Sequence, residues 1–102
     1  MMVNLSSEGK RFIMSKIERA AVAGTMESSD VYVELSPCEC GIEINLDSVV
    51  LDQFGDSIRA SVREVLDENG IDSARVSLVD RGALDCVIRA RVETAIVRAK
   101  GE

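Results

Sequence analysis

Two stretches of the chain place apolar residues at the three- and four-residue spacing of an amphipathic helix. The first covers residues 49–69, with Asp47 or Ser48 placed to cap its start and Gly70 just after its end. The second covers residues 83–99 and is followed by Gly101. The side chains expected on the two buried faces are Leu51, Phe54, Ile58, Val62 and Val65, and then Leu84, Ile88, Val92 and Ala95.

Two consequences follow from these helical stripes. If Phe54 is a core aromatic, its replacement by alanine should cost about 3–5 kcal/mol of unfolding free energy. In the second helix, Asp85 can form an ion pair with Arg89 one turn later.

Alternating apolar and polar residues predict strands elsewhere in the chain. Residues 31–35 and 42–46 have the period of a half-buried antiparallel sheet, and residues 36–41 form the expected turn between them. Residues 21–26 and 75–80 are the two further candidate strands. We therefore expect an α+β fold, in which two helices pack on one face of a mainly antiparallel sheet of about four strands.

The length of 102 residues is that of one domain. Met14 begins a segment that reads like a natural start, so residues 1–13 are expected to be an upstream extension. For the whole chain we expect a flexible amino-terminal extension over residues 1–19 and a single domain over residues 20–102. No apolar run approaches the roughly 20 residues of a membrane span, and no apolar signal segment opens the chain. We expect a cytoplasmic protein with reduced cysteines and no membrane partner.

Charge is unevenly distributed along the chain. The net charge is −6, and residues 21–74 contain twelve acidic and two basic side chains. Such an acidic surface argues against nucleic acid as a partner, because nucleic-acid affinity comes largely from lysine and arginine. It favours a partner protein with a basic surface, although a solvated acidic face that maintains solubility is the simpler explanation.

The expected turn at residues 27–30 contains two adjacent serines, Ser28 and Ser29, between Glu27 and Asp30. The chain has no histidine, and no lysine lies near the serines in sequence, so neither hydroxyl has a base to activate it as a nucleophile. A serine in this setting is better explained as a site of modification. Acid–base chemistry by two of Glu27, Asp30 and Glu34 is conceivable, but a solvated turn needs no such explanation.

Three cysteines, Cys38, Cys40 and Cys86, could in principle bind a soft metal. Structural zinc sites normally have four ligands in paired C-x-x-C spacing, so a metal or redox role is the weaker interpretation, and Cys86 is expected to be a small buried residue. Asp80 is placed to cap the turn into the second helix. The remaining candidates, Arg89 and Arg91, are expected on a solvated helix face.

Three segments together resemble the acyl carrier subunit, or gamma chain, of bacterial citrate lyase. They are AVAGTMESSD at residues 21–30, QFGDSIR at residues 53–59 and DRGALDCVIRARVE at residues 80–93. The resemblance covers about residues 20–98 and implies that residues 20–102 form a single acyl carrier domain. It also implies a non-catalytic carrier, not an enzyme.

In that family the serine after the glutamate of the AGT-x-ES motif carries a prosthetic group through a phosphodiester, and the matching residue here is Ser28. The implied group is 2'-(5''-phosphoribosyl)-3'-dephospho-CoA, whose terminal thiol holds an acetyl group as a thioester. Ser29 adjoins Ser28, so Ser28 is assigned as the attachment residue because it is the serine that directly follows the glutamate. The aspartate–serine motif of four-helix fatty-acid carriers is absent.

The resemblance implies several partners. The alpha subunit exchanges acetyl for citryl, and the beta subunit cleaves citryl to oxaloacetate and regenerates acetyl, so that citrate yields acetate and oxaloacetate. A prosthetic-group transferase (holo-carrier synthase) loads the arm, and an acetate ligase acylates its thiol.

The alternatives are a scaffold subunit without a prosthetic group, a cysteine-based thiol or metal module, and a carrier for a lyase acting on a methylated citrate analogue.

Overall fold

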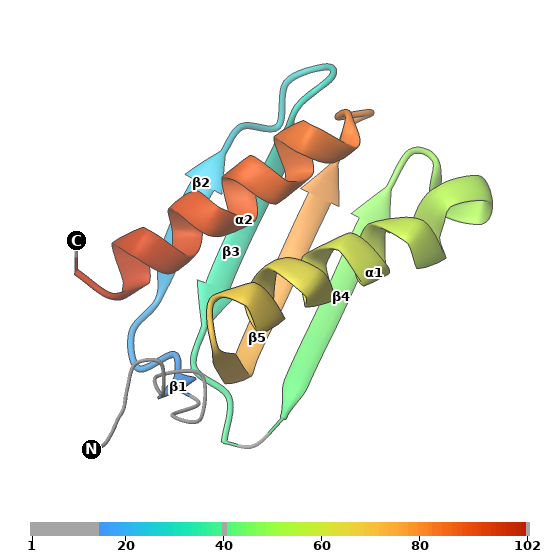
Figure 1. Ribbon diagram of the computed structural model, residues 1–102. Helices are drawn as coiled ribbons and strands as arrows, with labels where there is room; N and C mark the ends of the chain where they lie inside the picture. Colours follow the sequence, from blue (N-terminus) through green and yellow to red (C-terminus); the bar gives the residue numbers. More distant parts are fainter. Residues whose placement is uncertain (1–14, 40, 102) are drawn as a thin grey trace.

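In residues 15–39 and 41–101, which the computed structural model describes, two helices lie on one face of a mixed sheet (Figure 1). Helix α1 lies over β4 and β5, whereas α2 lies over β2 and β3, and the two helices contact each other. The elements, in chain order, are β1 (Ser15–Lys16), β2 (Ala21–Gly24), β3 (Val31–Ser36), β4 (Ile42–Ser48), α1 (Leu51–Glu68), β5 (Ile71–Asp80) and α2 (Asp85–Ala99).

Strand β5 lies in the interior of the sheet, whose order is β2-β3-β5-β4. It pairs antiparallel with β3, for example Leu78 with Val33, and parallel with β4, for example Val76 with Ile44. The short strand β1 runs parallel to the first residues of β5. The predicted α+β fold with two helices over one face is confirmed, and the sheet is mixed.

The predicted pairing of β3 with β4 is wrong, because β5 lies between these two strands. The reason is the helix between β4 and β5. A strand–helix–strand connection returns the chain in the same direction, so β4 and β5 form a parallel pair. Strands β3 and β4 therefore lie on opposite sides of β5 and do not form a hairpin.

The core lies between the sheet and the helices. From α1 it receives Ile58, Val62, Val65 and Leu66, and from α2 Ile88, Val92, Ala95 and Ile96, all at most 6% exposed. Both predicted stripes are thus correct in their central parts.

At their amino-terminal ends the stripes are wrong. Leu51 and Phe54 are 41% and 52% exposed, and Leu84 is 70% exposed. The first turns of α1 extend beyond the edge strand β4 (Figure 1), and Leu84 lies in the loop before α2. The apolar spacing of the sequence therefore includes positions where no strand lies beneath the side chain to bury it.

The helix ends lie close to the predicted positions. Ser48, one of the two residues expected to cap α1, accepts a hydrogen bond from the Val50 N–H (3.1 Å). The helix itself begins after Val50 without a side-chain cap. The predicted ion pair between Asp85 and Arg89 is confirmed at 2.8 Å.

The described part of the predicted extension, residues 15–19, contributes to the core. Ile17 is 3% exposed, and its N–H donates to the Ser73 carbonyl (2.9 Å). Residues 1–14 lie outside the described residues, so the division into an extension (1–19) and a domain (20–102) stays a prediction. Neither helix in the described ranges has the length and hydrophobicity that a membrane crossing requires.

The corrected core predicts a contrast between two α1 residues. Leu66→Ala should lower the unfolding free energy by about 2–5 kcal/mol, because Leu66 is 1% exposed and its removal leaves a cavity. Phe54→Ala, at a half-exposed position, should cost less than about 1 kcal/mol. Urea unfolding of both variants measures the difference, and a larger loss for Phe54→Ala would contradict the packing described here.

Candidate functional site

The serine turn, residues 27–30, connects β2 to β3 at one end of the sheet (Figure 1). The Asp30 N–H donates to the Glu27 carbonyl (3.1 Å), which closes the turn. Ser28 and Ser29 occupy its two corners, and both are exposed. Ser29 has φ 66°, a positive value that occurs at the third position of type II turns.

The backbone of the serine turn is fixed to the loop that follows β5. The Ser29 N–H donates to the Arg81 carbonyl (2.8 Å), and the Arg81 N–H donates to the Asp30 carbonyl (2.9 Å). In contrast, neither the Ser28 hydroxyl nor the Ser29 hydroxyl makes a hydrogen bond within residues 15–39 and 41–101. The turn thus combines an anchored backbone with two exposed hydroxyls.

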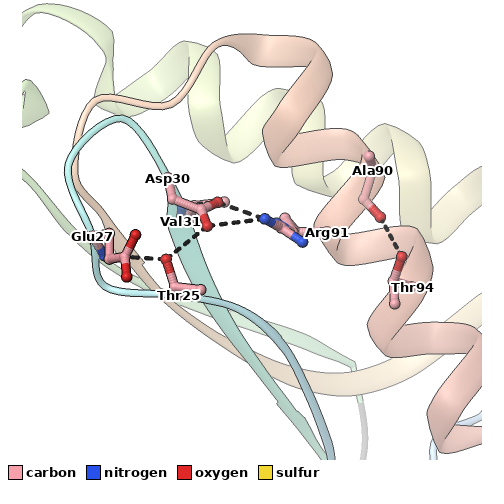
Figure 2. Close-up of polar contacts among 7 residues, drawn as sticks. All are labelled: Thr25, Glu27, Asp30, Val31, Ala90, Arg91 and Thr94. Carbon is pink, nitrogen blue, oxygen red and sulfur yellow. Dashed lines mark hydrogen bonds and ion pairs between the residues drawn. The ribbon is translucent and has the colours of Figure 1, made fainter.

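A second set of contacts joins the turn to α2 through the Asp30 carboxylate. Arg91 donates from Nε (3.1 Å) and Nη2 (2.9 Å) to the two carboxylate oxygens, a bidentate ion pair. The Thr25 hydroxyl (2.7 Å) and the Val31 N–H (2.7 Å) also donate to Asp30. The Thr25 oxygen accepts in turn from the Glu27 N–H (3.2 Å). Figure 2 shows Asp30 between the turn and the helix, with Arg91 pointing toward it.

These donors stabilise the charged form of Asp30, which is 15% exposed. The hydrogen bonds from Arg91, then from Thr25 and the Val31 N–H, lower the pKa of Asp30 from 3.8 to about 2. The carboxylate is therefore ionised at neutral pH, and Arg91 compensates its charge.

Gly24 permits the close approach of the strands next to the turn. It has φ 90°, and a Cβ there would lie 1.9 Å from the Val31 carbonyl oxygen and 3.3 Å from Arg91 Cδ. A side chain at this position would collide with the backbone that carries the turn. This accounts for the glycine of the AGT segment.

The last residue of β5, Asp80, forms hydrogen bonds with the two neighbouring loops. Asp80 is 1% exposed, and its carboxylate accepts from the Ala83 N–H (2.9 Å) and the Ser48 hydroxyl (2.8 Å). The Asp80 carbonyl accepts from the Val49 N–H (3.2 Å). Asp80 therefore holds the turn before α2 but does not cap the helix, which begins at Asp85 after Leu84 without a side-chain cap.

Known proteins match the chain over most of its length. The family model described as malonate decarboxylase delta subunit (MdcD) matches residues 18–99. The citrate lyase acyl carrier protein of Haemophilus influenzae strain PittEE is 53% identical over 87 residues, which are 85% of this chain and 90% of that protein. Its counterpart in Rhodopseudomonas palustris is also 53% identical with the same coverage. The chain belongs to the citrate lyase acyl carrier protein family.

One solved structure supports the fold. A chain of a Pseudomonas malonate decarboxylase hetero-tetramer in complex with malonate superimposes with a TM-score of 0.72. It is 21% identical, and the match covers 81% of this chain and 86% of that chain. The family is named for carriers, which agrees with the expectation that this chain is a carrier and not an enzyme.

Arg91 is the site residue that the sequence prediction misassigned, because it was expected on a solvated helix face. It instead binds Asp30, 61 positions earlier in the chain. The available signal was the segment at residues 80–93, whose resemblance to the family extends beyond what a helix requires. Arg89 is also paired, with Asp85 and with Glu64 of α1.

The three carboxylates considered for acid–base chemistry do not form one cluster. Glu27 is exposed on the turn and Asp30 is bound to Arg91. Glu34 lies within β3, exposed between the buried Val33 and Leu35, and pairs in register with Ser77. The geometry therefore does not favour acid–base chemistry.

The cysteines do not support a metal site either. Cys40 lies outside the described residues, and Cys86 is exposed on α2, so the prediction that Cys86 is buried is wrong. The described ranges contain no group of three or more histidine, cysteine or acidic side chains that could hold a metal ion.

The geometry at Gly24 predicts a contrast with Gly82, which has a similar φ of 94° but no atom within 4 Å of a built Cβ. Gly24→Ala should lose about 3 kcal/mol or more, because backbone strain and a collision add. Gly82→Ala should lose only the strain, about 1–2 kcal/mol. Equal losses in chemical unfolding would contradict the close approach of Gly24 to Val31.

The depressed pKa predicts how stability depends on pH. Because folding lowers the pKa of Asp30 from 3.8 to about 2, its contribution is complete above pH 3.8 and is lost as the pH falls toward 2. The stability advantage of wild type over Asp30→Asn should therefore be constant near neutral pH and shrink between about pH 4 and 2. Denaturant unfolding across this range is the test, and a pH-independent difference would contradict the ion pair.

Proposed function

We propose that this chain is the acyl carrier subunit of a citrate lyase and that Ser28 carries its prosthetic group. The supporting observation is the anchored turn, whose two serine hydroxyls are exposed and make no hydrogen bond in the described part of the chain; Ser28 is the one that directly follows Glu27. A modifying enzyme must reach such a hydroxyl from solvent, and exposed turns allow this. Membership of the family supports the same assignment.

The residues around Ser28 fit a phosphodiester-linked arm. The carboxylate beside the turn, Asp30, is compensated by Arg91, which weakens its repulsion of a phosphate. The Arg81 backbone and the Asp30 network fix the base of the arm, while the exposed corner leaves room for its motion. The group we propose is 2'-(5''-phosphoribosyl)-3'-dephospho-CoA, which supplies a thiol for thioester chemistry.

The task of the chain is then delivery. A tethered thioester stays at high effective concentration near the enzymes that act on it. We propose as partners the alpha subunit, which exchanges acetyl for citryl, and the beta subunit, which cleaves citryl to oxaloacetate and restores acetyl. A prosthetic-group transferase and an acetate ligase prepare the arm, and we expect the assembly in the cytoplasm.

The proposal predicts different outcomes for the two serines. Ser28→Ala should abolish attachment of the arm and lyase activity, because no hydroxyl remains at the attachment point. The unfolding free energy should change by no more than about 0.5 kcal/mol, since the side chain is exposed. Ser29→Ala is the matched control and should retain attachment. Each variant is incubated with the transferase and its nucleotide donor, and intact mass gives the result.

Two results would contradict this assignment in different ways. Attachment to Ser28→Ala together with loss of attachment to Ser29→Ala would move the site by one residue. Failure to modify wild type and both variants would overturn the carrier function itself, in favour of a scaffold or thiol module.

A further inference from the structure

Four large apolar side chains are exposed close to the amino-terminal ends of the two helices, and we name them the apolar end patch. Val49 is 64% exposed, Leu51 41%, Phe54 52% and Leu84 70%. They contribute little to the core, and their exposure to water is unfavourable. Exposed apolar side chains that gather in one region are typical of interaction sites.

The apolar end patch and Ser28 lie at the same end of the molecule. The loops that carry the patch are bound to Asp80, through the Val49 N–H (3.2 Å) and the Ala83 N–H (2.9 Å). The next residue, Arg81, binds the serine turn through the Ser29 N–H (2.8 Å). Figure 1 shows the three loops together at the end of the sheet where β5 finishes. A protein that reaches Ser28 from this end would therefore meet the patch.

Acidic side chains outnumber basic ones along the chain at the α1 part of the patch. Residues 44–59 contain the exposed Asp47, Asp52 and Asp56 and one basic residue, Arg59, which lies 4.0 Å from Asp56. This combination of an apolar centre and a charged rim is the usual anatomy of a protein interface. The negative charge of the rim favours a partner whose facing surface is basic.

We propose that the apolar end patch docks the enzyme that attaches the arm to Ser28, through an apolar surface rimmed by lysine and arginine. This inference depends on the proposed function. The enzyme must bind a phosphate-rich nucleotide donor beside Ser28, so its surface there must be cationic. The acidic rim complements that surface, and the apolar side chains provide contact area that excludes water.

Steady-state kinetics of arm attachment test the proposal, with the full chain as the varied substrate. The double variant Phe54→Gln/Leu84→Gln should raise the KM for the carrier about tenfold, as expected when interface anchors are lost. The kcat should remain unchanged, because the serine turn is intact. Val97→Gln, at an apolar position of α2 outside the patch that is 39% exposed, is the matched control and should leave KM unchanged.

The salt dependence of arm attachment tests the acidic rim separately. The wild-type kcat/KM should fall as the salt concentration rises, and Asp52→Asn should reduce this dependence. Circular dichroism and thermal unfolding of every variant establish that the fold is retained.

The possible results separate the two claims. If wild type is not modified at all, the proposed function fails and the docking proposal with it. If wild type is modified and the double variant has an unchanged KM, or Val97→Gln raises KM equally, only the docking proposal is overturned. A wild-type dimer that the double variant dissociates would assign the patch to a second copy of the chain and overturn the proposal as well.

Discussion

The carboxyl end of β5 is the constraint on which the geometry around the serine turn depends. Two consecutive residues, Asp80 and Arg81, hold the loop before α1, the loop before α2 and the serine turn through hydrogen bonds of 2.8–3.2 Å. Strand β5 can do this because it lies between β3 and β4, with the two helices on one side of the sheet. The interior position of one strand therefore sets the relative positions of all three loops.

The ion pair between Asp30 and Arg91 adds the second attachment of the serine turn. It joins the turn to α2, so that the residues flanking Ser28 are held from the sheet and from the helix layer. Ser28 itself is exposed and makes no hydrogen bond among the described residues. This combination suits the proposed carrier role, because the effective concentration of a tethered group depends on where its attachment point is held.

The sequence predicts the elements well because their signals are local. Alternation identifies the strands, helical spacing identifies the helices, and the serine turn follows from its place between two strands. The partners of each strand were not predictable in this way, since the paired residues of β3 and β5 are 39 to 49 positions apart in the sequence. The contact of Arg91 with Asp30 is equally non-local. The exposure of Phe54 depends on where the sheet ends beneath α1, which no helical pattern records.

The central claim is that Ser28 bears a covalent arm, and mass analysis of the chain purified from its native host tests it most directly. The account predicts an intact mass greater than that of the sequence by one phosphodiester-linked nucleotide arm, with fragmentation locating the addition on Ser28. An unmodified mass in an active lyase assembly, or an arm located on Ser29 or on a cysteine, would contradict it.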